Sequence, residues 1–354
     1  MKERGLSEQW LINLAAYLAE TRFVGPVEIL DLKKHTEGWS RTTISFTADD
    51  GSTEERIVVR IETEALLSPS SHGIEYEYEV MKAMEETDVP CPMMYDLESD
   101  RKILGEKFFL AEFINGETPN VWRSHWRERL QGEWATEGRP LPNQFVDILV
   151  DLHSIDTDRI DVLDDPGADD VAANELAEYE EWYGSTKRTN PVLEEAFRWL
   201  ESNMPMVSER TFVHGDYRVG NMLLDDSRVE GLLDWELARI SDPMYDLGFT
   251  STRYLNGRLT NPADQPEYVN SLLPKQWFFE EYARRAGREI DFDRVRYWQI
   301  FSLTQHLCHI LLAIDRYADG DSADVRNAWL QYMIPAIMTE LLEYLESDRT
   351  IDPS

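Results

Sequence analysis

Residues 211–246, TFVHGDYRVGNMLLDDSRVEGLLDWELARISDPMYD, decide the fold of this chain. Two short apolar runs, 222–224 and 229–233, are separated by a polar turn, and this pattern predicts a β-hairpin. Because a hairpin brings its two ends together, Asn221 before the first run should lie beside Asp234 after the second. The stretch therefore predicts one local unit that presents an amide oxygen next to a carboxylate.

The polar residues of this unit suit phosphoryl transfer. Asn221 and Asp234 are candidate ligands of Mg²⁺, a hard cation that takes oxygen ligands and leaves room for phosphate oxygens. Asp216, at the mouth of the loop, is the candidate base that takes a proton from a hydroxyl. Arg218 in the same loop is a candidate to steady the transferring phosphate or the acceptor, and a salt bridge to a neighbouring acid is the equal alternative. A base and two metal ligands are what phosphoryl transfer requires of a protein.

The spacing His214-x-Asp216-x-x-x-x-Asn221, followed by Asp234, resembles the aminoglycoside phosphotransferase and choline kinase branch of the protein-kinase-like fold. The strings HGDYRVGN and LDWELARISDPMYDLG are most similar to the subgroup that includes the kinase-like domain of some acyl-CoA dehydrogenases. The resemblance implies that Asp216 is the catalytic base and that Asn221 and Asp234 hold Mg²⁺. It also implies that Asp246 braces the catalytic loop from the following helix.

The fold implied by this resemblance is α+β and two-lobed. The N-lobe is an antiparallel sheet plus a helix that binds the nucleotide, and the C-lobe is mainly helical and carries the catalytic loop and the acceptor pocket. The predicted organisation is an N-terminal helix (1–24), the N-lobe (25–113), a hinge (114–120), the C-lobe (121–346) and a tail (347–354).

Candidate nucleotide-binding residues lie in the N-lobe. Gly38 and Ser40 stand in a turn between two predicted strands, where kinase-like proteins fold a loop over the phosphates; an ordinary hairpin turn is the alternative. Arg60 ends the strand run VVR, where such folds usually carry lysine. Arginine keeps the chemistry, since it grips phosphate bidentately, and the subgroup often carries it. A surface cation on an edge strand is the alternative for Arg60.

Two further nucleotide contacts follow from the resemblance. Glu77, on a helix predicted over 72–86, would pair with Arg60; the choice of Glu77 over its acidic neighbours rests on the resemblance, and a solvated acidic face is the alternative. Glu112 and Phe113 end the apolar run 106–113 at the predicted hinge. There they would meet adenine through main-chain groups, so their side chains carry no signal.

Long helices are predicted over 268–286, 291–317 and 322–345, and in this family such C-terminal helices wall the acceptor pocket. Trp298, His306 and Asp315 are candidates to line it. His306 and His309 are three residues apart on the middle helix, but no third ligand with matching spacing accompanies them. They are therefore interpreted as core or pocket histidines.

Composition restricts the partners and the surroundings. Acidic residues outnumber basic ones by 68 to 35, and the net charge of −33 argues against nucleic-acid and anionic-membrane partners, which need basic patches. No apolar window is long enough for a membrane span, and the two cysteines, far apart in sequence, predict reduced thiols in a cytoplasmic protein. An acidic surface poor in lysine is typical of halophilic proteins, with an ordinary acidic protein as the alternative.

These observations predict a Mg²⁺-dependent phosphotransferase that moves the γ-phosphoryl of ATP or GTP to a hydroxyl of a small molecule. The motif resemblance favours a metabolite over an antibiotic as acceptor. A catalytically inactive nucleotide-binding scaffold is the alternative, supported by arginine at position 60 and opposed by the intact Asp216, Asn221 and Asp234. A protein kinase is disfavoured, because too few residues separate Asp234 from Asp246 for an activation segment.

Overall fold

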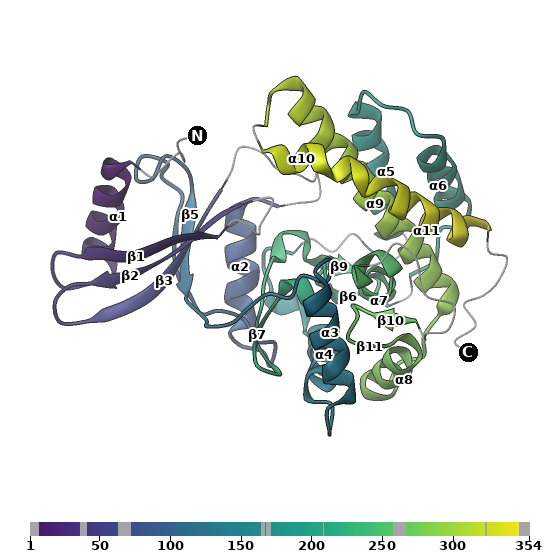
Figure 1. Cartoon of the computed structure of the whole chain (residues 1–354), viewed down its shortest axis with the longest axis horizontal. Coiled ribbons are helices and arrows are strands. Elements are labelled where there is room, and N and C mark those ends of the chain that lie inside the picture. The colour runs from purple at the N-terminus through teal and green to yellow at the C-terminus, as the bar shows by residue number, and fades with distance from the viewer. Residues whose placement is uncertain are drawn as a thin grey trace.

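A computed structural model of the chain describes residues 7–35, 41–62, 72–163, 167, 171–207, 209–257, 267–322 and 324–346. The predicted phosphate-loop residues Gly38 and Ser40 and the predicted tail 347–354 lie outside these ranges. Figure 1 shows two lobes, a sheet with two helices at one end and a largely helical lobe at the other. The predicted α+β, two-lobed, kinase-like fold is confirmed.

The described strands of the N-lobe form one antiparallel sheet in the order β1-β2-β3-β5-β4. They agree with the runs of β-branched and aromatic residues in the sequence, including the predicted pair over 93–97 and 106–113. The strands are β1 (Glu28–His35), β2 (Thr42–Asp49), β3 (Glu54–Ile61), β4 (Met94–Glu98) and β5 (Phe108–Glu112).

The two faces of this sheet pack against different helices. Along β5, Phe108 and Leu110 join a core with α1 (Glu8–Thr21), whereas Phe109 and Ala111 join a core with α2 (Ile74–Met84). Successive side chains of a strand point to opposite faces, so one apolar strand can serve both cores. The α2 core is continuous with that of the C-lobe, and α2 lies between the sheet and the helical lobe (Figure 1).

Residues 211–241, the predicted catalytic segment, form two short antiparallel pairs. The predicted hairpin is confirmed as β7 (Met222–Asp225) paired with β8 (Arg228–Leu232). The segments that flank it, β6 (Thr211–Val213) and β9 (Arg239–Ser241), also pair with one another. Both ends of the predicted loop are therefore tied together by backbone hydrogen bonds.

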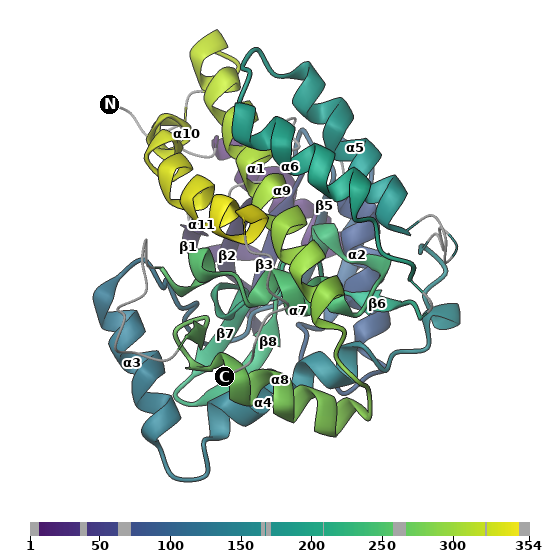
Figure 2. The ribbon, with the colours of Figure 1, turned by 90° about the vertical axis from the view of Figure 1, so that its right-hand side faces the viewer.

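The C-lobe is built around α9, which is buried along most of its length. Figure 2 shows α9 among α5, α6, α7 and α11, and all four contact it. The described helices of this lobe are α3 (Ser124–Ala135), α4 (Pro140–Leu152), α5 (Val171–Ser185), α6 (Pro191–Ser202), α7 (Met244–Thr250), α8 (Lys275–Ala286), α9 (Phe292–Asp319), α10 (Val325–Trp329) and α11 (Ile334–Glu346). Single 3₁₀ turns lie at Thr157–Arg159, Val219–Asn221, Trp235–Leu237, Arg253–Asn256 and Leu330–Tyr332.

The prediction of one helix over 268–286 is wrong in its first part. Residues 268–274 form a small hairpin of β10 (Tyr268–Val269) and β11 (Leu273–Pro274), and α8 begins only at Lys275. The turn residues Asn270 and Ser271 have φ values of 54° and 56°. Their side chains bond to backbone groups elsewhere in the lobe, and such bonds compete with helix formation.

The prediction of one helix over 322–345 is also wrong. The segment divides into α10, a 3₁₀ turn and α11. Pro335 lies in the first turn of α11, where proline is tolerated, but a continuous helix would place it in the interior, where it removes a backbone hydrogen bond.

Two further expectations concern membrane spans and cysteines. No helix in the described ranges has the length and apolar character needed to cross a bilayer. Cys308 is buried and Cys91 is partly buried, and both are free.

Candidate active site

The catalytic loop after β6 holds Asp216 between two donors. Arg218 Nε lies 2.9 Å from Asp216 Oδ1, and Asn221 Nδ2 donates to Asp216 Oδ2 at 2.8 Å. Asn221 Nδ2 also donates to the backbone oxygen of Asp216 at 2.9 Å. The structure thus brings together the predicted base, the predicted loop cation and one predicted metal ligand.

The contacts of Asn221 determine which of its side-chain atoms faces outward. Both contacts to Asp216 are to oxygens, so the amide nitrogen must be the atom that faces them. Oδ1 is then the outward atom, and no donor to it is found in the described ranges. The backbone oxygen of Asn221 accepts from Leu233 N at 2.8 Å, which fixes it next to the residue that precedes Asp234.

His214 joins the loop to the same segment from inside the protein. Its Nδ1 accepts from Asp216 N at 3.2 Å, so its Nε2 carries the proton and donates to Leu233 O at 3.0 Å. The ring is fully buried, and burial lowers the pKa of His214, although the neighbouring aspartates oppose the shift. A neutral His214 therefore fixes the separation between Asp216 and the Asp234 segment.

Asp246, at the start of α7, braces this loop as the family resemblance implies. Its carboxylate is fully buried and accepts from the amides of His214 and Gly215 at 2.8 and 2.9 Å. His153, at the end of α4, lies 3.2 Å from it through Nε2. Burial alone would raise the pKa of Asp246, but the contact with His153 and the amide bond outweigh it and hold that pKa below its usual value.

Gly215 permits the close approach of this loop to the following turn. Its φ is 79°, and a Cβ added there would lie 2.4 Å from the carbonyl oxygen of Leu237. We expect Gly215→Ala to lower the free energy of unfolding by at least about 2 kcal/mol, since it adds left-handed strain to a backbone clash. Denaturant unfolding measures this. Gly138→Ala, also at positive φ (73°) but with no atom within 4 Å, is the control for strain alone.

Asp234 lies opposite the loop in an unusual backbone conformation. It adopts φ 72° and ψ 60°, a left-handed geometry that is rare outside glycine, asparagine and aspartate. Arg60 Nη2 donates to its Oδ1 at 2.7 Å. Burial would raise the pKa of Asp234, but the charge of Arg60, followed by that of Arg218, outweighs it and lowers the pKa. Asp234 is therefore an ionised carboxylate.

Arg60, on β3 of the N-lobe, contacts one acidic residue in each lobe. Its Nε lies 2.9 Å from Glu77 Oε1, while its Nη2 contacts Asp234. Glu77 on α2 is fully buried. The structure thus places Arg60 against the helix acid named from the sequence and also against a predicted metal ligand, which the sequence did not indicate.

A family model described as the phosphotransferase enzyme family matches residues 31–288 of this chain. The chain belongs to the phosphotransferase enzyme family. The match covers most of the sheet, the predicted hinge and residues 211–246, and the resemblance to this family drawn from residues 211–246 is confirmed.

Relatives in sequence carry the name of a different enzyme class. The chain is 27% identical to acyl-CoA dehydrogenase family member 10 of Mus musculus over 240 residues, which are 67% of this chain and 21% of the relative. It is 26% identical to the probable acyl-CoA dehydrogenase IBR3 of Arabidopsis thaliana over 290 residues, 75% of this chain and 34% of the relative. The chain thus spans only a fifth to a third of the length of these relatives.

Solved structures show the same fold. A putative aminoglycoside phosphotransferase from Ralstonia eutropha superposes with a TM-score of 0.72 at 21% identity, covering 95% of this chain and 98% of the other. A thermostable mutant of aminoglycoside phosphotransferase APH(4)-Ia, in a ternary complex with AMP-PNP and hygromycin B, superposes with a TM-score of 0.60 at 17% identity, covering 93% of this chain and 98% of the other.

The predicted hinge offers fewer main-chain groups to a nucleotide than the sequence indicated. The amide of Glu112 donates to Met93 O at 2.8 Å, so among its main-chain groups only the carbonyl remains a candidate for adenine. The Phe113 ring lies under the Arg56 guanidinium, 3.6 Å from its centroid. Gly38 and Ser40, the other predicted nucleotide contacts, lie outside the described residues.

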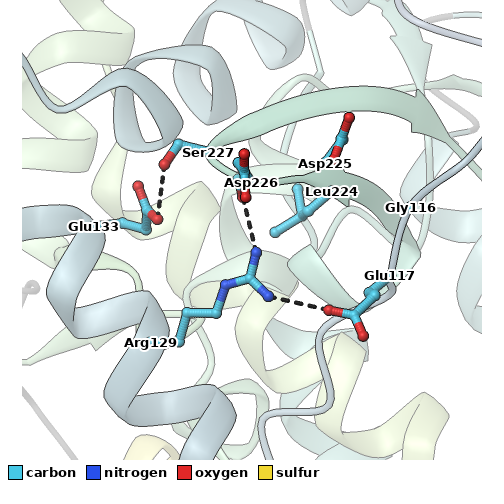
Figure 3. A pocket seen from close by; sticks show the side chains of 8 residues that line it. All are labelled: Gly116, Glu117, Arg129, Glu133, Leu224, Asp225, Asp226 and Ser227. Atoms are coloured by element: carbon cyan, nitrogen blue, oxygen red, sulfur yellow. Dashed lines mark hydrogen bonds and ion pairs between the residues drawn. The ribbon is translucent and has the colours of Figure 1, made fainter.

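A hollow of about 610 Å³ lies where the hinge segment meets the tip of the β7–β8 hairpin. Figure 3 shows Arg129 of α3 between Glu117, 3.2 Å away, and the backbone oxygen of Asp226, 3.0 Å away. The residues that line the hollow are Gly116, Glu117, Arg129, Glu133, Leu224, Asp225, Asp226 and Ser227. None of the predicted catalytic or metal residues is among them, so we assign it no role in the reaction.

The candidates for the acceptor pocket separate in the structure. Trp298 is fully buried and donates to Asp242 at 2.8 Å, and Asp315 is bonded to Lys187 N and to Arg188, so both serve packing. His306 remains a candidate. Its ring stacks on Phe249, and Tyr254 lies 5.1 Å away between centroids. No group of three histidine, cysteine or acidic side chains in the described ranges is arranged to hold a metal.

Two contacts with residues of the predicted site were not indicated by the sequence. Asn270, in the β10–β11 turn, accepts from the catalytic-loop amide of Val219 at 3.0 Å through Oδ1. Arg41, just before β2, contacts Glu77 and Glu236. The positive φ of Asn270 could have been suspected from an asparagine followed by serine, but nothing near Arg41 in sequence indicates its partners.

His309 gives the protein a measurable pH dependence. Burial, with a smaller contribution from His306, lowers its pKa from 6.5 to about 3. Between pH 6.5 and about 3 the unfolded state binds a proton at His309 that the folded state does not. The free energy of unfolding is therefore highest, as far as His309 is concerned, above pH 6.5, and it decreases as the pH falls below that value. We expect stability to fall by up to about 1.4 kcal/mol per pH unit more in the wild type than in His309→Gln between pH 6 and 4, measured by denaturant unfolding. Equal slopes in the two proteins would contradict it.

Proposed function

We propose that the chain is a Mg²⁺-dependent phosphotransferase that moves the γ-phosphoryl of ATP or GTP to a hydroxyl of a small molecule. Asp216 accepts or orients the hydroxyl proton, and Arg218, 2.9 Å from it, steadies the transferring phosphate or the acceptor. Asn221 and Asp234 hold the metal ion. Arg60, paired with Glu77, grips the phosphates, with Gly38, Ser40, Glu112 and Phe113 as the remaining nucleotide contacts.

The observation that carries this proposal is the hydrogen-bonded unit of the catalytic loop and the Asp234 segment. Asn221 is bonded to Asp216 through its side chain and to Leu233 through its backbone, and His214 bonds to Leu233 from the interior. A base and two metal ligands are thereby held in fixed relative positions. Such fixed positions are what phosphoryl transfer requires, because little of its catalysis is covalent.

The donor set fits Mg²⁺. The Asp234 carboxylate is ionised and the Asn221 Oδ1 has no other described donor, so both offer hard oxygen ligands. Magnesium usually takes one or two protein carboxylates and completes its shell with phosphates and water, so no larger protein cage is required. When bound, it would neutralise the charge of the phosphates.

The acceptor is proposed from the relatives rather than from the site. Those relatives are named as acyl-CoA dehydrogenases, which favours a metabolic hydroxy compound, such as an acyl-CoA-linked hydroxy acid, over an antibiotic. The net charge of −33 favours a cytoplasm of high salt as the working medium. Assays in concentrated KCl follow from this.

Nucleotide binding tests the donor side. Mg²⁺ with a non-hydrolysable ATP analogue, at about 100 times its Kd, should stabilise the wild type by about 2.7 kcal/mol. The stabilisation should require Mg²⁺ and should weaken in Asn221→Ala, because Oδ1 is the ligand removed. Thermal unfolding in KCl with and without metal measures both, and protection that is equal without Mg²⁺ would contradict the metal assignment.

Phosphoryl transfer tests the acceptor side. Hydroxylated metabolites and aminoglycosides are screened separately with Mg·ATP, and ADP release is followed together with the mass of the product. Transfer to a metabolite supports the proposal, whereas transfer to aminoglycosides alone contradicts its choice of acceptor. Nucleotide binding without transfer to any acceptor would favour the inactive scaffold.

A further inference from the structure

Arg41 is a buried cation that the sequence did not single out and that the proposed mechanism does not use. It is the first described residue after 36–40, and its side chain is fully buried. A guanidinium keeps its charge at any physiological pH, so burial requires that it be paired with anions. Its partners therefore indicate what it does.

Those partners come from β3 and α2 of the N-lobe and from the segment after Asp234 in the C-lobe. Arg41 Nε lies 3.3 Å from Glu77 Oε2 on α2 and 3.8 Å from Glu236 Oε2, two residues beyond Asp234. Its Nη1 is 4.0 Å from Glu62 at the end of β3, and its Nη2 donates to His72 O at 2.6 Å. Glu77 is thereby shared between two arginines, with Oε1 facing Arg60 and Oε2 facing Arg41.

The charges form a continuous chain, Arg41–Glu77–Arg60–Asp234. In the proposed function, Arg60 must turn to phosphate and Asp234 to the metal ion. An unshared Glu77, buried and ionic, would hold Arg60 strongly, because charge attraction is large where water is excluded. A second cation on Glu77 weakens that hold.

We infer that Arg41 is a positioning residue: it balances the charge of Glu77 so that Arg60 is available to the nucleotide phosphates and Asp234 to the metal ion. This inference rests on the proposed function. It concerns affinity for a metal-bound nucleotide and acts through Arg60, since Arg41 itself contacts neither predicted metal ligand.

Hydrogen bonds that do not involve Arg41 also hold α2 in place. The start of α2 is also held to the segment after Asp234 by His72 N, which donates to Glu236 O at 3.1 Å. Tyr76 OH donates to Ala238 O at 2.7 Å, further along the same segment. These contacts remain in an Arg41 variant, so α2 is expected to keep its place while the charge balance changes.

Binding of Mg·ADP by titration calorimetry tests the inference. We expect Arg41→Gln to weaken Mg·ADP binding at least 10-fold and Arg41→Lys to weaken it less, since lysine keeps the charge. Arg101→Gln is the matched control: Arg101 pairs with the same Glu62 at 3.2 Å, but its side chain is 55% exposed. Its affinity should equal that of the wild type.

A double-mutant cycle separates positioning from general stability. If Arg41 acts through Arg60, Arg41→Gln should have little further effect on Mg·ADP affinity in an Arg60→Gln background. An equal loss in both backgrounds, or a lowered Tm of the free protein with unchanged affinity, would overturn the inference. If Arg41→Gln does not fold, Arg41→Met, which keeps a long side chain without the charge, carries the same cycle, and wild-type affinity in that variant overturns the inference. A wild type that binds no Mg·ADP would instead refute the proposed function.

Discussion

Asp216→Asn should lower the turnover number for phosphoryl transfer by about 10²- to 10⁴-fold, the range that a general base contributes. The asparagine keeps the size of the side chain, and its oxygen can still accept from Arg218. Its nitrogen cannot accept from Asn221, but Asn221 keeps its bond to the backbone oxygen of residue 216, so the loop should keep its shape. What is lost is the ability to take the proton of the acceptor hydroxyl. Mg²⁺-dependent nucleotide binding should remain close to that of the wild type, because Asp216 is not a proposed metal ligand.

Steady-state kinetics with an acceptor that the wild type phosphorylates measures the turnover number, and calorimetry of Mg·ADP binding measures the nucleotide affinity separately. Asp225→Asn is a suitable control, since it makes the same chemical change at an exposed position on the β7–β8 hairpin. Turnover of Asp216→Asn within a few-fold of the wild type would remove Asp216 from the role of base.

Asp234→Asn should abolish the Mg²⁺ dependence of nucleotide binding and reduce turnover at least as severely. Losing an outer-shell partner typically costs 10- to 100-fold in metal affinity, so losing a direct ligand should cost more than about 100-fold. The change also removes the anion that Arg60 contacts at 2.7 Å, which leaves Arg60 to Glu77 alone. Nucleotide affinity is therefore expected to become insensitive to metal.

The two variants have distinguishable signatures. Thermal protection by nucleotide, measured with Mg²⁺ and with a chelator, should show a metal effect in Asp216→Asn and none in Asp234→Asn. A wild-type metal effect in Asp234→Asn would mean that the ion is held elsewhere. Circular dichroism of both proteins confirms that the comparison is between folded states.

Local patterns in the sequence predicted the catalytic segment well, because its geometry is local. The two apolar runs and the turn between them specify a hairpin, and a hairpin fixes the separation of Asn221 and Asp234 without reference to the rest of the protein. The runs of β-branched residues likewise predicted the sheet. The helix prediction was wrong at 268–274, where contacts of Asn270 with Val219 and Thr250, distant in sequence, outweigh helical propensity.

The buried ion pairs around Arg60 show more clearly what could not be predicted from the sequence. The sequence named Arg60 and Glu77 as a pair through family resemblance, and the structure places them 2.9 Å apart. It did not indicate that Arg60 also meets Asp234, or that Arg41 shares Glu77. The pKa of Glu236, raised to about 8 by burial and then by the charges of Asp234 and Glu77, is another property that its neighbours in sequence do not predict.

The sequence by itself determined the family and the hairpin, and it supplied the proposed base and the two proposed oxygen ligands, since these depend on spacing within a few tens of residues. Only the tertiary structure decided which buried charge faces which, because β2, β3, α2 and the segment after β8 meet only when the two lobes pack. A buried ion pair is specified by distance in space, and residues such as Arg41 and Glu236 are far apart along the chain.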